Sequence, residues 1–183
     1  MYEKTHAFIA IHPPKGLISS LQKLLVDTEK DSSPPEINWS PWYKYHLTLF
    51  FWPALSFKEV VRGREQLAEL SKRLLMPSVK IRGFSYFEKA KALYLNETSS
   101  EIHELYRLMA SKLTETILPG PEKRESFIPH WTIARKFHPA QLKKHQLFFQ
   151  QLDSFSLSAR ADRISFFITR PGWYSPQLIC AFR

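Results

Sequence analysis

The chain has 183 residues, of which 44% are hydrophobic, so it can bury a sizeable core and is not a disordered segment. Its 26 Lys and Arg against 17 Asp and Glu give a net charge of +9, which favours polyanions such as nucleic acid, although solvated helix faces also carry such charge. The single cysteine, Cys180, excludes an internal disulfide. No apolar run approaches about 18 residues, so we expect a soluble, cytoplasmic protein that binds no membrane.

The first part of the chain alternates short apolar strands with amphipathic helices. The expected order is a strand at 6–12, a helix opened by Pro13 and Pro14, a loop at 31–36, a strand at 45–51, and a helix capped by Ser56. The helical spacing after Ser56 predicts that a set of apolar side chains faces inward, namely Phe57, Val60, Val61, Leu67, Leu70 and Leu74.

The second part of the chain reads mostly as antiparallel strands. The pattern predicts a hairpin from 79–87 and 91–97, a helix capped by Ser100, a loop at 118–126, a strand in 127–135, a helix at 139–151, and strands at 155–159, 163–169 and 176–182 with a turn at 170–175. In the helix after Ser100 the inward residues are expected to be Ile102, Leu105, Leu108, Met109, Leu113 and Ile117.

Two strands share an unusual pattern. "YHLTLFF" (45–51) and "FIPHWTIAR" (127–135) both place a His and a Thr two residues apart within an apolar run. Because side chains alternate along a strand, each His shares a face with its Thr, opposite a packed apolar face that includes Trp131. The two His lie 130 − 46 = 84 residues apart, close to half the chain, which indicates an internal duplication within one α+β domain spanning 1–183.

Paired imidazoles and hydroxyls suit a particular chemistry. Imidazole titrates near neutral pH, so one ring can serve as a base while the other serves as an acid. If the two strands face one another across a cleft, the rings can act on either side of a phosphodiester, and threonine hydroxyls can donate to its oxygens where charge builds. This scheme requires neither a metal nor a nucleophilic side chain.

Other interpretations remain beside this one. A His in an apolar strand is often a hydrogen-bonded structural residue. A zinc site would need a third protein ligand, which the pair does not supply. No nucleophile elbow supports a Ser-His-Asp hydrolase. The runner-up is a binding module that holds a nucleotide or an RNA end in the cleft without turnover.

The sequence resembles the two-histidine (2H) phosphoesterase superfamily, and within it the RNA 2′,3′-cyclic phosphodiesterases also called 2′-5′ RNA ligases. The blocks that carry the resemblance are "HAFIAIHPP", "YHLTLFF", "KALYLNE", "FIPHWTIAR" and "RISFFITRPGWYSPQLICAF", in family order along the whole chain. The resemblance implies a bilobal α+β fold in which two antiparallel sheets line a central cleft, with helices outside and a pseudo-twofold internal duplication. It also implies metal-independent hydrolysis of a 2′,3′-cyclic phosphate to a 2′-phosphomonoester, with reversible 2′-5′ RNA joining.

Site residues follow from the same resemblance. His46 matches the proton donor of the family and His130 the proton acceptor, although the symmetry of the motifs leaves these two roles exchangeable. Thr48 and Thr132 match the hydroxyls that bind the phosphate. Arg135 matches a frequent basic residue, and its guanidinium can hold a phosphate by two parallel hydrogen bonds.

The substrate is less well defined than the reaction. The resemblance implies RNA with a 2′,3′-cyclic phosphate end, or a small cyclic nucleotide, as the partner of a monomer that needs no cofactor. By strand alternation Phe50 lies on the His46 face and could stack on a base, while a place in the core is an equal alternative. The chain departs from the family at Trp52 and Pro53, where Gly is common, and at His6, so the fit at the cleft mouth is open.

Overall fold

The computed structural model describes residues 4–31, 37–114, 126–170 and 173–183, and these form two four-stranded antiparallel sheets with helices outside. The elements in chain order are β1 (Thr5–Ile11), α1 (Leu17–Asp31), the 3₁₀ turn η1 (Trp42–Lys44), β2 (Leu47–Leu55), α2 (Phe57–Ser71), β3 (Ser78–Phe87), β4 (Ala92–Glu97), α3 (Ser100–Thr114), β5 (His130–Arg135), α4 (Ala140–Lys144), α5 (Gln146–Asp153), β6 (Ser156–Arg160), β7 (Arg163–Arg170) and β8 (Trp173–Ala181).

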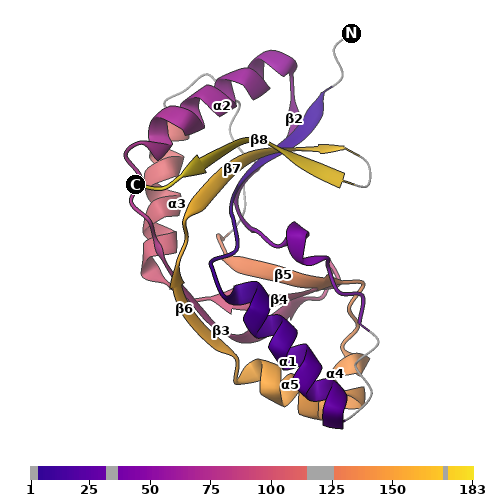
Figure 1. Ribbon diagram of the computed structural model, residues 1–183. Coiled ribbons are helices and arrows are strands. Elements are labelled where there is room, and N and C mark those ends of the chain that lie inside the picture. The colour runs from indigo at the N-terminus through magenta and orange to yellow at the C-terminus, as the bar shows by residue number, and fades with distance from the viewer. Residues whose placement is uncertain (1–3, 32–36, 115–125, 171–172) are drawn as a thin grey trace.

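The two sheets are built alike. Sheet A has the order β2-β1-β7-β8 and sheet B the order β5-β4-β3-β6 (Figure 1). In each, an inner strand is followed by a helix and then by an antiparallel neighbour at the sheet edge: β1, α1 and β2 in sheet A, and β4, α3 and β5 in sheet B. The two His-x-Thr motifs lie at the starts of the edge strands, with His46 directly before β2 and His130 first in β5. This confirms the predicted α+β fold with two antiparallel sheets and a repeated topology.

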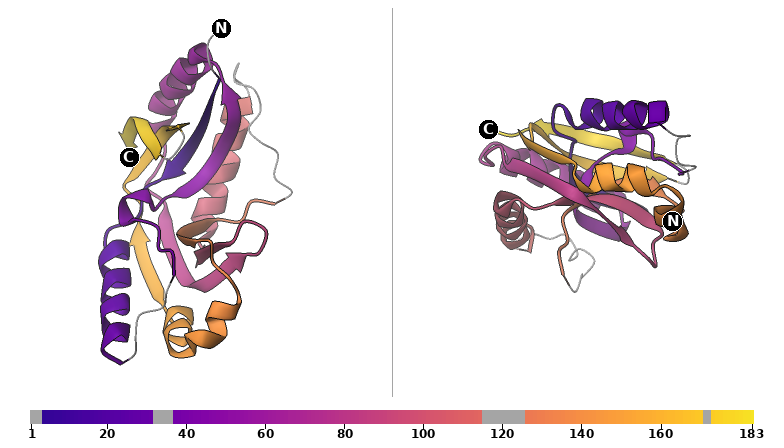
Figure 2. Two further views of the ribbon diagram at one scale, coloured as in Figure 1. Left: turned by 90° about the vertical axis from the view of Figure 1, so that its right-hand side faces the viewer. Right: turned by 90° about the horizontal axis from the view of Figure 1, so that it is seen from below.

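Helices α1 and α3 each contact the sheet that does not contain the strand before them. α1 follows a strand of sheet A, yet its Leu21 lies beside Ile133 of sheet B and Phe148 of α5 around a small apolar pocket. α3 follows a strand of sheet B, yet Tyr106 stacks on Phe50 of sheet A with ring centroids 4.9 Å apart. The views of Figure 2 show α1 with α5 and α2 with α3 on the outside of the sheets. Each motif strand is therefore backed by helices on its apolar face.

One contiguous hydrophobic core joins both sheets. The buried residues of α2 are Val60, Gly63, Leu67 and Ser71. Phe57 was expected to face inward but is 68% exposed, because the buried stripe of the helix begins only one turn later, at Val60. Leu108 of α3 was also expected inside and is 50% exposed, since its neighbour Met109 takes the buried position. The predicted inward residue Ile117 lies outside the described residues.

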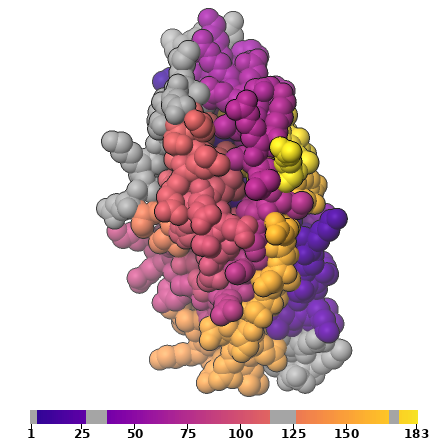
Figure 3. All heavy atoms as spheres, turned by 90° about the vertical axis from the view of Figure 1, so that its left-hand side faces the viewer, coloured from indigo at the N-terminus to yellow at the C-terminus, as the bar shows by residue number. Residues whose placement is uncertain are grey.

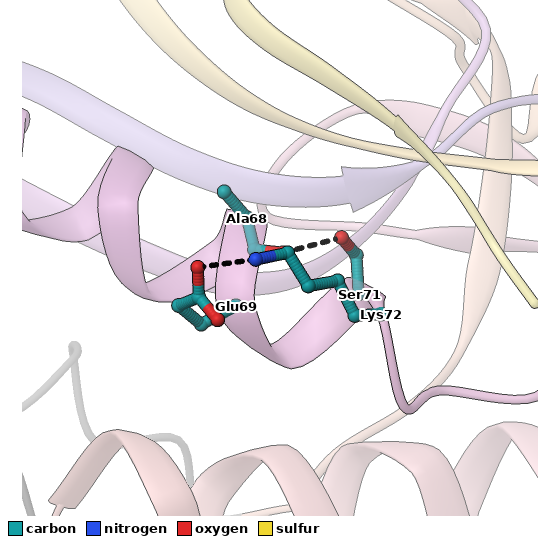
Figure 4. A network of polar contacts seen from close by, with 4 residues as sticks. All are labelled: Ala68, Glu69, Ser71 and Lys72. Atoms are coloured by element: carbon teal, nitrogen blue, oxygen red, sulfur yellow. Dashed lines mark hydrogen bonds and ion pairs between the residues drawn. The ribbon is translucent and has the colours of Figure 1, made fainter.

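The capping residue predicted from the sequence marks the start of α2 correctly. Ser56 accepts a hydrogen bond from the Glu59 backbone N–H, and the Glu59 carboxylate accepts one of 2.6 Å from the Ser56 N–H, which confirms the predicted cap. In the last turn the Ser71 hydroxyl donates to the Ala68 carbonyl and Lys72 pairs with Glu69 at 2.6 Å (Figure 4). This ion pair is exposed, so it adds little stability.

Other limits differ from the predictions. The helix predicted at 139–151 is two helices, α4 and α5, separated at His145. β7 continues to Arg170 and β8 begins at Trp173, so part of the turn predicted at 170–175 belongs to strands. Of the loop predicted at 31–36, Asp31 is the last residue of α1 and the rest lies outside the described residues, as does most of the loop predicted at 118–126. Figure 3 shows the face on which α3 lies beside α2. Within the described ranges, no helix is long and apolar enough to cross a membrane.

Candidate active site

The two motif histidines stand at matching positions with matching hydrogen bonds. His46 directly precedes β2, and His130 is the first residue of β5. The Nδ1 of each ring lies 2.7 Å from the carbonyl oxygen two residues earlier, that of Lys44 or of Ile128. Because a carbonyl only accepts, Nδ1 is the protonated nitrogen in both rings. Each neutral ring therefore carries its lone pair on Nε2, the nitrogen that can exchange a proton with a substrate.

A β-bulge follows the threonine in both motifs. In β2 the register shifts so that Thr48 pairs with Ala10 and Phe50 with Ile9, and Leu49 is the extra residue. In β5 it shifts between Thr132 and Ala134, so Ile133 is the extra residue. A bulge of this kind resets the alternation of side chains.

The bulges decide which side chains share the face of the histidines. After the bulge of β2, Phe50 points into the core, where it is 2% exposed, and Phe51 takes the half-buried position on the cleft side. The expectation that Phe50 stacks on a base is therefore not supported, and the alternative of a core residue holds. In β5 the same displacement leaves Ala134 buried and Arg135 exposed. Arg135 and Phe51 are thus equivalent positions of the two strands.

The segment before His46 is attached to the strand of His130. The Arg135 N–H donates to the Asn38 carbonyl at 3.0 Å, the Ser40 N–H donates to the Ile133 carbonyl at 2.8 Å, and Trp39 forms a bridge with Ala134. The chain then makes the turn η1 and enters His46. These bonds bring the start of β2 in sheet A to the edge of β5 in sheet B.

Aromatic rings surround both histidines. Phe8 stacks on His46 with ring centroids 5.0 Å apart, and Phe8 in turn stacks on Phe167 at 4.7 Å. His130 contacts Phe87 edge-on at 4.9 Å and Tyr94 at 5.1 Å. The strand pairings place all four aromatic residues on the same face as the motif histidines. These rings limit the access of water to the imidazoles.

Burial governs the electrostatics of His46. Desolvation is the largest influence and lowers the pKa of His46 to about 4, against a hydrogen bond to Lys44 that acts to raise it. Charge on Arg135, His130 and His12 lowers this pKa further. In the ligand-free protein at neutral pH, His46 is a neutral imidazole.

His12 is a site residue that the sequence did not indicate. It follows β1, and its Nε2 lies 2.6 Å from the hydroxyl of Ser165, which is fully buried on β7. Burial, followed by the charge of Arg163, lowers the pKa of His12. No local pattern marks this residue, because its partner is 153 residues away.

A buried carboxylate supports the strand of His130. Trp131 lies in the core as expected, and its indole N–H donates to Glu97 at 3.2 Å. Glu97 also accepts from the N–H groups of Lys80 and Ser99, both at 2.9 Å. Its burial raises its pKa despite these bonds. Among the described residues no group of three His, Cys, Asp or Glu is placed to hold a metal ion.

Known proteins of the same fold agree with this arrangement. TT0787 of Thermus thermophilus superposes with a TM-score of 0.70 at 19% identity, over 97% of this chain and 98% of that one. E. coli LigT complexed with 3′-AMP gives a TM-score of 0.65 at 16% identity, over 98% and 99%. E. coli LigT complexed with phosphate gives 0.59 at 15% identity, over 98% of both chains. Among curated sequences, none matches significantly.

The sequence also matches a protein-family model. Residues 42–173, which include both His-x-Thr strands, match the model of the 2′-5′ RNA ligase superfamily. The match spans well over half of the chain, and the superposed structures cover 97% and 98% of it. The chain therefore belongs to the 2′-5′ RNA ligase superfamily, within the two-histidine phosphoesterases.

Proposed function

We propose that this protein hydrolyses RNA or nucleotide 2′,3′-cyclic phosphates to 2′-phosphomonoesters without a metal, and that the same site can join 2′-5′ ends in reverse. The observation that carries the proposal is the repeated geometry of His46 and His130, each with Nδ1 bound to a carbonyl and each sharing a strand face with a threonine. Membership of the superfamily supports it. So do the 3′-AMP and phosphate complexes of LigT, which has the same fold.

The proposed mechanism uses the two imidazoles in opposite directions. His130 takes a proton from a water molecule through Nε2 as the water oxygen attacks the phosphorus. The bond between phosphorus and the ribose 3′ oxygen breaks, and His46 gives that oxygen its proton. Thr48 and Thr132 donate to the non-bridging oxygens, and Arg135 stabilises their charge. The product keeps its phosphate on the 2′ oxygen, and the two rings have exchanged protonation states.

Binding of the anionic substrate favours the protonated form of His46. His46 is neutral in the free protein because burial lowers its pKa to about 4. A cyclic phosphate is an anion, and a negative charge beside an imidazole raises the pKa of that ring. In the proposed mechanism the protonated form of His46 is therefore populated in the complex, where it is needed.

The decisive experiment is an assay on an oligoribonucleotide that ends in a 2′,3′-cyclic phosphate, in the presence of EDTA, with separation of 2′- from 3′-phosphate products. We expect clean 2′-phosphate from the wild type. His46→Ala and His130→Ala should each lose about 10²- to 10⁴-fold in kcat, the usual contribution of a general acid or base.

His138→Ala is the matched control, because His138 is exposed and lies after the second motif strand. It should retain full activity. An activity that EDTA abolishes and added metal restores would contradict the mechanism. Binding of the oligonucleotide with no product from the wild type would favour the non-catalytic binding module.

A substrate with a modified leaving group shows which histidine is the proton donor and which is the proton acceptor. A cyclic substrate with sulfur in place of the ribose 3′ oxygen needs no proton on the departing atom. If His46 is the acid, His46→Ala should recover most of its activity on this substrate, while His130→Ala stays impaired on both. Recovery by His130→Ala alone would reverse the assignment.

A further inference from the structure

The cleft face of sheet B is polar and basic well beyond His130. Strand pairing identifies the residues that share this face, because partners in a sheet point to the same side. By the registers of β5 with β4, β4 with β3, and β3 with β6, the face includes His130, Thr132, Arg135, Ala92, Tyr94, Asn96, Ser85, Phe87, Arg82, Lys80, Ser78, Ser156, Ser158 and Arg160. None of these described residues is acidic.

The cations of this face line up with the active site. Asn96 pairs with His130, and its side-chain amide donates to the Arg82 carbonyl at 3.2 Å. Arg82 and Lys80 pair in turn with Ser156 and Ser158 of β6. Because neighbouring strands lie about 4.8 Å apart, Arg82 is about 10 Å from His130 across the sheet. Both Arg82 and Lys80 are exposed.

Sheet A offers a different surface to the same cleft. Its side near His46 is formed by Phe8, Ala10 and Phe167, which are buried against one another, with Phe51 packed at their edge. One cation on this side of sheet A is Arg163, which shares the face of Ser165 and Phe167 and lies 3.4 Å from the Asp162 carboxylate, whereas the described face of sheet B holds several cations and no acidic residue. Arg160 is partly committed, because its guanidinium donates to the Met76 carbonyl at 2.9 Å. With Arg135 assigned to the terminal phosphate, Lys80 and Arg82 are the cations of this face best placed for the rest of an RNA strand.

We propose that Lys80 and Arg82 hold the phosphodiester backbone on the 5′ side of the terminal cyclic phosphate, so that the substrate is an oligoribonucleotide and not a mononucleotide. The inference rests on the proposed function, since it takes the phosphate between His46 and His130 as the end of the RNA. Successive phosphates of the RNA lie at increasing distance from that end. The row of polar side chains on sheet B likewise leads away from His130, from Asn96 to Arg82 and then to β6. Contacts of this kind bind any sequence and weaken with salt.

The test measures how binding depends on the length of the RNA and on the salt concentration. The probe is a fluorescent oligoribonucleotide that ends in a 2′-phosphate, whose Kd is measured by anisotropy from about 50 to about 200 mM NaCl without turnover. Lys80→Gln/Arg82→Gln should weaken binding several-fold and flatten the slope of log Kd against log salt by about 1.4, or about 0.7 for each lost contact to a single strand. KM for a cyclic mononucleotide should stay unchanged, and so should kcat on both substrates.

The matched control is Lys58→Gln/Arg64→Gln, which removes one exposed Lys and one exposed Arg from α2. It should leave both the affinity and the salt slope as in the wild type. If the sheet B variant binds like this control, or if both variants lose affinity equally, the inference is wrong. A wild type that binds the oligonucleotide with the expected slope but hydrolyses nothing would reject the proposed function and keep this binding surface.

Discussion

Burial of His46 links the chemistry of the site to the stability of the fold. In the unfolded chain this imidazole titrates near pH 6.5, whereas in the folded protein burial lowers its pKa to about 4. Between these values the unfolded state binds a proton that the folded state does not. The free energy of unfolding therefore falls as the pH drops from about 6.5 to about 4, and is unaffected by this residue at higher pH. His12, whose pKa is also lowered, acts in the same direction.

We expect the substitution His46→Gln to reduce this pH dependence. Between pH 7 and pH 4.5 the wild type should lose about 2 kcal/mol more unfolding free energy than the variant, because glutamine does not titrate. Urea denaturation at the two pH values measures the difference. The exposed residue His138 provides the control, and His138→Gln should lose as much as the wild type. Equal losses for all three proteins would show that His46 is not desolvated in the fold.

At the scale of elements, the bulges of β2 and β5 place the basic and aromatic positions of the cleft. Without them, simple alternation would put Phe50 beside His46 and bury Arg135. With them, Phe50 joins the core and Arg135 reaches the site, where its charge acts on His46. The histidines and threonines precede the bulges, so alternation predicts their shared face correctly. The side chains that follow require knowledge of the partner strand.

The packing of α2 on sheet A makes a separate prediction. A Cβ atom at Gly63 would lie 2.7 Å from the ring of Phe166, which is fully buried. Helix propensity alone would make Gly63→Ala stabilising by up to about 1 kcal/mol. We expect a net destabilisation of about 1 to 3 kcal/mol instead, because a ring fixed in the core cannot move away without repacking. Thermal or urea unfolding measures the change.

A double-mutant cycle isolates the steric cause. In a Phe166→Leu background the ring is gone, so adding Gly63→Ala should cost much less than it does in the wild type. The coupling between the two positions should be about 1 kcal/mol or more. A Gly63→Ala protein more stable than the wild type, or a cycle without coupling, would show that α2 does not approach β7 this closely.

On the scale of the whole molecule, the site exists because two similar halves face each other. Each half supplies one imidazole and one threonine on an edge strand, and helix α1 or α3 crosses over to pack on the other half. The segment before His46 is hydrogen-bonded to β5, so the start of one motif strand is attached to the other. The halves differ in their surfaces, since Phe51 of β2 stands at the position that Arg135 occupies in β5.

The sequence by itself determined the features that depend on local patterns. Strand alternation placed His46 with Thr48 and His130 with Thr132, and the capping signal at Ser56 set the start of α2, because both are encoded within a few residues. The tertiary structure decided which side chains lie beyond the bulges, that His12 meets Ser165, and that the pKa of His46 is low. Those properties depend on strand register and burial, which are set by residues far away along the chain and cannot be derived from a local window.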